Sequence, residues 1–135
     1  MRIVLDADAW VSAILLPGGT ADRAVLAVLA GKATALISEP LVAAVIRVLG
    51  RNFSRDREQL ARVAILLNEL AEPIAPRDRV CDLSDAPDTR VLQCAVAGRA
   101  DLVVTGDRAM LRLARHEGIE IVSVRAFLQR LGAEA

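Results

Sequence analysis

Aromatic residues are scarce in this sequence of 135 residues, which contains no Tyr, two Phe and one Trp, 2% in all. Hydrophobic residues nevertheless make up 54%, so the core has to be built from Leu, Val, Ile and Ala. This composition speaks against disorder and suits helices packed on a buried sheet. Because the length fits one domain with a core of ordinary size, we expect residues 1–135 to form a single domain.

The sequence also lacks an excess of either charge, since Lys plus Arg and Asp plus Glu number 17 each. No overall field attracts nucleic acid, and a nucleic-acid contact would have to come from a local basic patch. Lys32 is the only Lys. This near-absence of Lys weighs against phosphate chemistries that require a placed Lys.

Cysteine and histidine are too few for a sulfur- or imidazole-based site. Cys81 and Cys94 form no CxxC pair, and Cys94 falls in an apolar helical pattern that predicts a core position. The only His, His116, is expected at the surface, at the end of a helix over 108–116. We expect a reducing cytoplasm. Neither a signal peptide nor an apolar run long enough to span a membrane is visible.

Short apolar runs alternate with amphipathic stretches along the whole chain. Buried strands are predicted at 3–5, 33–37, 102–104 and 119–122, and a short edge strand at Ile74, because Pro73 and Pro76 exclude a central one. Helices are predicted at 10–16, 20–31, 40–50, 58–70, 88–98, 108–116 and 124–131. The alternation predicts an α/β fold of three layers, α/β/α, with a central, mostly parallel sheet of about five strands.

Three acidic residues are expected at one edge of this sheet. Asp6 follows the first strand, Asp107 follows the strand at 102–104, and Asp88 begins the helix that leads into that strand. Ligands of open parallel sheets bind outside the carboxyl ends of the strands, so these carboxylates can converge on one pocket. An alternative role for Asp6 or Asp8 is to cap the helix that follows.

Three neighbouring carboxylates repel one another unless a cation lies between them. Oxygen ligands without His or Cys select Mg²⁺ or Mn²⁺. Sites of this kind activate water and stabilise the leaving oxygen in phosphodiester cleavage. The acidic residues therefore favour a metal-dependent hydrolase of phosphodiesters.

Four stretches resemble PIN-domain nucleases, in particular the VapC-like toxin components of toxin–antitoxin pairs. They are Ile3-Val4-Leu5-Asp6-Ala7-Asp8, Leu36-Ile37-Ser38, Asp88-Thr89-Arg90-Val91-Leu92-Gln93-Cys94-Ala95, and Ala100-Asp101-Leu102-Val103-Val104-Thr105-Gly106-Asp107-Arg108. The resemblance covers nearly the whole chain, and the strand ending in Thr-Gly-Asp is its most specific part.

The resemblance implies a PIN-like fold and a Mg²⁺- or Mn²⁺-dependent endoribonuclease. Asp6, Asp88 and Asp107 would be its catalytic, metal-binding acids, with Asp8 and Thr105 in supporting positions. It also implies an RNA substrate, a small antitoxin partner and a homodimer.

One position departs from the family. The family has a Glu early in the helix after the second strand, and an ungapped alignment puts Ala44 there. Natural loss, a deliberate inactivating substitution and replacement by another acid are three explanations. Asp8 could compensate in part, whereas Glu39 lies about 140° away around the helix and is a poorer substitute. Our hypothesis is that the chain binds metal and RNA but cleaves weakly.

Two other functions stay open. A catalytically inactive PIN fold could bind RNA or protein. Arg90 and Arg108 either hold RNA phosphates or are solvent-facing helix residues or ion-pair partners of Asp and Glu. The more remote alternative is a haloacid-dehalogenase-type phosphatase, in which Asp6 would be the nucleophile and Asp8 the acid/base. No Lys follows Thr105 to neutralise the transferred phosphoryl group, so that alternative is disfavoured.

Overall fold

The computed structural model describes residues 1–52, 55–75 and 87–134, with side chains at 87–88 and 133–134 left aside. The strands are β1 (Arg2–Leu5), β2 (Thr34–Ser38), β3 (Glu72–Ile74), β4 (Leu102–Val104), β5 (Arg115–His116) and β6 (Ile119–Val122). The helices are α1 (Ala7–Leu15), α2 (Thr20–Leu29), α3 (Glu39–Asn52), α4 (Arg57–Leu70), α5 (Pro87–Ala97), α6 (Arg108–Leu113) and α7 (Val124–Glu134).

The strands form one sheet in the order β3-β2-β1-β4-β6-β5. All neighbouring pairs are parallel except β5 and β6, which are antiparallel. The two central strands β1 and β4 pair with Leu5 opposite Val104. This register places Asp6 and Thr105 side by side, one residue beyond the strands.

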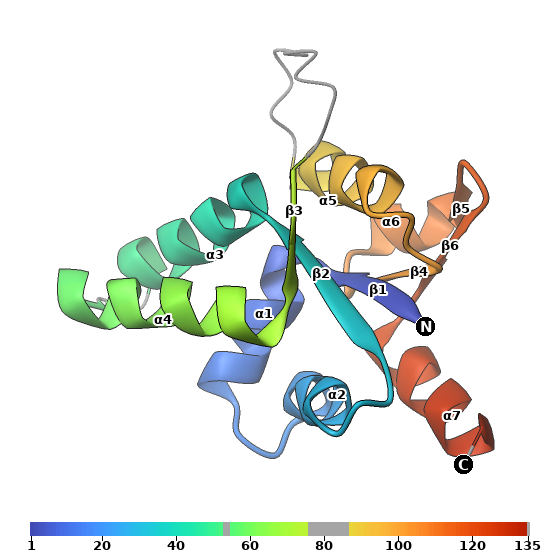
Figure 1. Cartoon of the computed structure of the whole chain (residues 1–135), viewed down its shortest axis with the longest axis horizontal. Helices are drawn as coiled ribbons and strands as arrows, with labels where there is room; N and C mark the ends of the chain where they lie inside the picture. Colours follow the sequence, from blue (N-terminus) through green and yellow to red (C-terminus); the bar gives the residue numbers. More distant parts are fainter. Residues whose placement is uncertain (53–54, 76–86, 135) are drawn as a thin grey trace.

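Helices cover both faces of the sheet, as the α/β/α prediction requires. In Figure 1, α5 and α6 lie above the strands, and α1, α2 and α7 lie below them. The apolar run Ile3, Val4 and Leu5 is fully buried, which agrees with a parallel strand covered on both faces. The two described aromatic side chains, Trp10 and Phe127, are buried in the same core.

The sheet of the described residues has six strands, in line with the predicted sheet of about five. One prediction at the carboxyl-terminal side needs correction, because the helix predicted at 108–116 ends at Leu113. Ala114 has a φ of 62°, which ends the helix, and Glu117 and Gly118, with φ of 47° and 80°, form a tight hairpin turn between β5 and β6. His116 therefore lies in an edge strand, not at a helix end.

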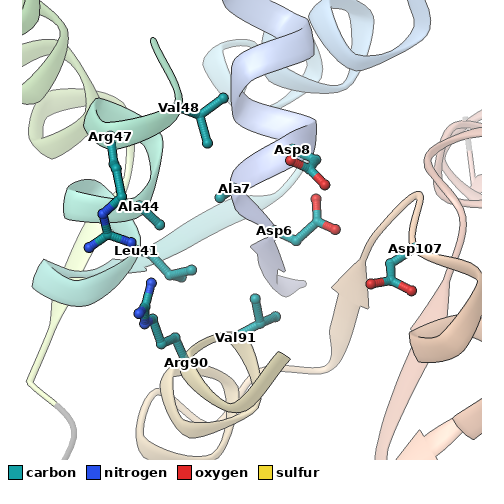
Figure 2. Close-up of a pocket in the computed structure, with 10 residues that line it drawn as sticks. All are labelled: Asp6, Ala7, Asp8, Leu41, Ala44, Arg47, Val48, Arg90, Val91 and Asp107. Carbon is teal, nitrogen blue, oxygen red and sulfur yellow. The ribbon is translucent and has the colours of Figure 1, made fainter. Parts of the chain in front are cut away.

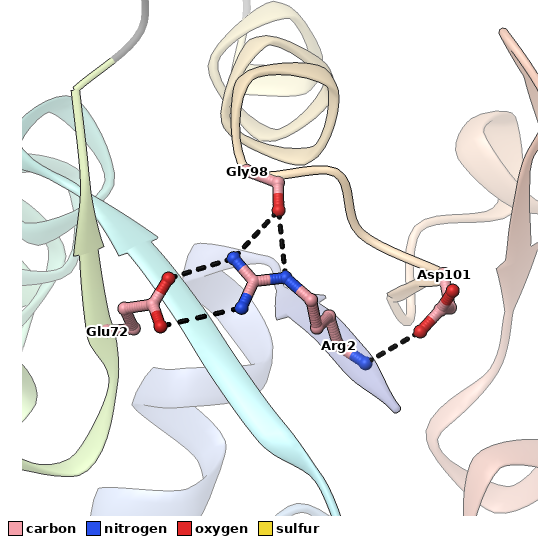
Figure 3. Close-up of polar contacts among 4 residues, drawn as sticks. All are labelled: Arg2, Glu72, Gly98 and Asp101. Atoms are coloured by element: carbon pink, nitrogen blue, oxygen red, sulfur yellow. Dashed lines mark hydrogen bonds and ion pairs between the residues drawn. The ribbon is translucent and has the colours of Figure 1, made fainter.

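Hydrogen bonds from Arg2 connect several elements at the amino-terminal edge of the sheet, opposite the acidic residues (Figure 3). Its guanidinium donates two hydrogen bonds to the carbonyl of Gly98, at 3.0 and 2.8 Å, and two to the carboxylate of Glu72, at 3.4 and 2.8 Å. Its backbone N–H donates to Asp101 at 2.8 Å. One side chain thus joins β1, the edge strand β3 and the carboxyl-terminal end of α5, where a cation is favoured.

No single helix in the described part of the chain is long and apolar enough to cross a membrane. The pair α1 and α2, bent by 96°, passes the same test by length and composition only.

Candidate metal and nucleic-acid site

A pocket of about 140 Å³ opens at the carboxyl edge of β1 and β4 (Figure 2). Three carboxylates lie on one side of it, and two guanidinium groups lie on the other. The residues that line it are Asp6, Ala7, Asp8, Leu41, Ala44, Arg47, Val48, Arg90, Val91 and Asp107. The edge of the parallel sheet and the first turns of α1 and α5 thus meet where the sequence predicted the site.

A chain of hydrogen bonds joins Asp6, Thr105 and Asp107. The hydroxyl of Thr105, which is fully buried, donates to Oδ2 of Asp6 and accepts from the backbone N–H of Asp107 at 3.0 Å. The contact between Asp6 and Thr105 follows from the pairing of β1 with β4, and the Asp6 backbone N–H donates to the carbonyl of Val104 at 3.2 Å. Thr105 therefore fixes the position of one acid and the loop that carries the other.

Both acids also cap the helices that follow them. Oδ1 of Asp6 accepts from the N–H of Ala9 at 2.8 Å at the start of α1. Oδ1 of Asp107 accepts from the N–H groups of Ala109 and Met110, at 2.8 and 3.4 Å, at the start of α6. Capping and lining the pocket are compatible roles, because one oxygen of each carboxylate serves the cap.

Asp6 is 7% exposed, and this burial raises the pKa of its carboxyl group above the ordinary value of an Asp side chain. The hydrogen bonds from Thr105 and Ala9 lower the pKa, whereas the negative charges of Asp8 and Asp107 raise it further. The net shift is upward. Burial and the neighbouring carboxylates thus both disfavour the ionised form of Asp6, and a cation in the pocket would favour it.

The structure brings most of the predicted site residues together. Asp8 and Asp107 line the pocket with Asp6, and Ala44 lines its opposite wall and is 7% exposed. Asp88 lies in the first turn of α5, and its side chain is outside the described part. That turn reaches the pocket, because Arg90 and Val91 line it.

Two charged residues that the sequence raised as candidates do not line the pocket. Arg108 is exposed at the start of α6 and does not line the pocket in the described part of the chain. Glu39 is exposed at the start of α3 and is likewise outside the lining. The second observation agrees with the expectation that Glu39 is a poor replacement for an acid at position 44.

Arg47 is a pocket residue that the sequence analysis missed. It follows Ala44 by three residues on α3, and residues at this spacing share one face of a helix. The same spacing could have identified it, since a position that faces the site predicts that its neighbour at i+3 faces it as well.

The donor set fits a hard divalent cation by chemistry. Asp6, Asp8 and Asp107 offer only oxygen, and no His or Cys of the described residues lines the pocket, which matches the preference of Mg²⁺ and Mn²⁺. Among the described residues, however, no three His, Cys, Asp or Glu side chains lie close enough to form a ready ligand cluster. The carboxylates of Asp6, Asp8 and Asp107 line one pocket but do not form such a cluster.

The fold and the pocket together define an α/β/α domain with an acidic pocket at the carboxyl edge of its central strands. The sequence matches the PIN domain family over residues 2–109, and the chain belongs to this family, whose members are generally nucleases.

A similar solved structure is the crystal structure of VapBC2 from Rickettsia felis bound to a DNA fragment from their promoter. Its matching chain has a TM-score of 0.65 and 17% sequence identity, and the alignment covers 91% of this chain and 98% of that one. At this identity the likeness shows a shared fold. No curated protein matches the sequence.

Proposed function

We propose that this chain is a metal-dependent endoribonuclease, the toxin component of a toxin–antitoxin pair, that hydrolyses RNA phosphodiesters at the acidic pocket. The observation that carries the proposal is the meeting of Asp6, Asp8 and Asp107 at one pocket of a PIN-domain chain. The raised pKa of Asp6, caused mainly by burial, agrees with a carboxylate placed to face a cation.

Asp6, Asp88 and Asp107 would hold Mg²⁺ or Mn²⁺. When bound, the metal would supply an activated water and stabilise the leaving oxygen. Thr105 is a positioning residue, because its hydroxyl holds the Asp6 carboxylate and the backbone of Asp107 at once. Asp8 adds negative charge at the rim, where it is exposed.

Ala44 would impair the reaction. Its side chain lines the pocket opposite the acids, so a carboxylate at this position would face Asp6 across the site. Without it the pocket has one acid fewer to attract and hold a divalent ion. We therefore expect weak cleavage from the chain as it stands.

The test compares the chain with its Ala44→Glu variant in Mn²⁺-dependent cleavage of a mixed structured RNA, with Asp6→Asn as the inactive control. We expect Ala44→Glu to cleave at least about tenfold faster, the effect of about 1.4 kcal/mol in the barrier. Equal and substantial cleavage by the two proteins would show that the site does not need an acid at position 44. If neither protein cleaves, the ribonuclease proposal fails.

A second candidate, a PIN fold that binds RNA or protein without cleaving, is favoured by two observations. The described acids form no ready ligand cluster, and Ala44 provides no carboxylate on the wall opposite Asp6. RNA binding without cleavage, in both the chain and the Ala44→Glu variant, would support this candidate.

We also propose a small antitoxin as protein partner, a homodimeric assembly and a cytoplasmic location. The antitoxin is supported by the fold shared with a chain of the VapBC2 structure. Co-expression with the product of a small neighbouring reading frame, followed by size-exclusion chromatography with light scattering, tests partner and assembly together.

A further inference from the structure

The wall of the pocket opposite the acids is basic. Arg47 of α3 and Arg90 of α5 both line it, and Figure 2 shows their guanidinium groups turned toward each other on the side away from Asp6, Asp8 and Asp107. The two residues lie 43 positions apart in the sequence, yet α3 and α5 pack together. The pocket is therefore bipolar, with carboxylates on one wall and guanidinium groups on the other.

Arg90 makes an interaction of its own, and Arg47 adds a second guanidinium group beside it, so an anion is favoured at this wall. No carboxylate of the described residues is hydrogen-bonded or ion-paired to Arg47. Ala44, one turn before Arg47 on the same face, is too short to provide one. Arg47 is also exposed, so an incoming ligand can reach it.

We propose that Arg47 and Arg90 hold a phosphate group of the RNA on the α3–α5 wall, one step along the strand from the phosphate that faces the acids. The planar fork of Arg matches phosphate oxygens in pairs. A negatively charged backbone lying across the pocket would meet the basic wall with one phosphate and the cation-binding wall with the next. The inference rests on the proposed function, because it takes RNA as the ligand.

The basic wall also gives Ala44 a second consequence. A Glu at position 44 would lie three residues before Arg47 on the same helix face, the spacing at which opposite charges pair. Such a pair would occupy Arg47 and weaken the phosphate contact. The substitution is thus expected to favour metal binding and to disfavour metal-free RNA binding.

The experiment measures binding of a short fluorescein-labelled single-stranded RNA by anisotropy, in EDTA so that neither metal nor cleavage contributes. Arg47→Ala is expected to weaken binding roughly three- to tenfold and to lower the slope of log affinity against log salt by about 0.7, the value for one phosphate contact on a single strand. Arg47→Lys is expected to retain the slope. Arg23→Ala is the matched control, an exposed Arg on α2 outside the pocket lining.

If Arg47→Ala and Arg23→Ala have the same RNA affinity and the same salt slope, the proposal is overturned. The basic wall would then be a candidate site for a carboxylate of a protein partner. The fluorescence of Trp10, the only Trp, verifies that each variant is folded. The result is separable from the cleavage test. RNA binding that depends on Arg47, without cleavage by any variant, would refute the nuclease and retain the phosphate contact. RNA cleavage together with RNA binding that does not depend on Arg47 would support the nuclease and refute the phosphate contact.

Discussion

Replacing Thr105 with Val tests whether the hydroxyl between Asp6 and Asp107 organises the site. The substitution keeps the branched shape but removes the donor to Asp6 Oδ2 and the acceptor for the Asp107 N–H. Thr105 is fully buried, so water cannot replace these bonds without a rearrangement. A hydrogen bond to a charged group contributes about 1.5–3 kcal/mol and a neutral one about 0.5–1.5 kcal/mol. We expect a loss of about 2–4 kcal/mol in the free energy of unfolding.

Urea unfolding at neutral pH, followed by the fluorescence of the buried Trp10, measures this loss. Thr105→Ser is the control, because it keeps the hydroxyl and loses only a methyl group, at a cost of about 1 kcal/mol. The Thr105→Val penalty should shrink in acid, since protonation of Asp6 removes the charge that the hydroxyl stabilises. If the Val variant is as stable as the Ser variant within about 0.5 kcal/mol, the hydroxyl does not organise the site.

Two further substitutions test the charge of the pocket and the packing beside it. Burial raises the pKa of Asp6, so the folded state binds this proton more tightly than the unfolded state, and stability falls as pH rises from the unfolded carboxyl pKa to the folded one. Asp6→Asn removes that cost, so we expect the variant to be at least as stable as the parent at neutral pH. Below the carboxyl pKa of the unfolded state this gain in stability should disappear. We also expect the variant to be inactive in RNA cleavage. Gly98→Ala places a Cβ 2.7 Å from Cδ1 of the fully buried Leu36 and should cost about 1–3 kcal/mol in urea unfolding.

Each of these predictions has a clear contrary result. An Asp6→Asn variant that is less stable than the parent at neutral pH would show that hydrogen bonding to the ionised carboxylate outweighs its burial. For Gly98→Ala the control is Gly132→Ala, where an added Cβ meets open space within α7 and better helix propensity should add up to about 1 kcal/mol. Equal effects of the two changes would mean that the contact at Leu36 relaxes freely.

The sheet was predictable from the sequence because its strands are short apolar runs buried on both faces. The edge position of β3 followed from Pro73, which cannot donate to a neighbouring strand. The hairpin of β5 was missed because Arg115 and His116 carry no apolar signal. Its only mark is the Glu117-Gly118 turn, in which a non-Gly residue takes a positive φ.

The acidic wall could be predicted from the same strand logic, since Asp6 and Asp107 follow two strands that end at the same edge. The basic wall was predictable only in part: Arg90 was among the expected phosphate contacts, whereas its meeting with Arg47 depends on how α3 and α5 pack against each other. Arg90 follows Asp88 by two residues within α5, and Arg108 follows Asp107 directly at the start of α6, yet only Arg90 lines the pocket.

The acids of this pocket differ in how much of each carboxylate remains for a ligand. Both oxygens of Asp6 already accept hydrogen bonds, from Ala9 and from Thr105, whereas the described bonds of Asp107 use only Oδ1. Oδ2 of Asp107 and the exposed carboxylate of Asp8 are therefore the oxygens most open to a cation, and Asp6 contributes through its remaining lone pairs. Ala44 supplies no oxygen on the facing wall, so among the described residues that line the pocket only Asp6, Asp8 and Asp107 offer carboxylate oxygens to a divalent ion. That asymmetry leaves the opposite wall, with Arg47, to bind the anionic partner.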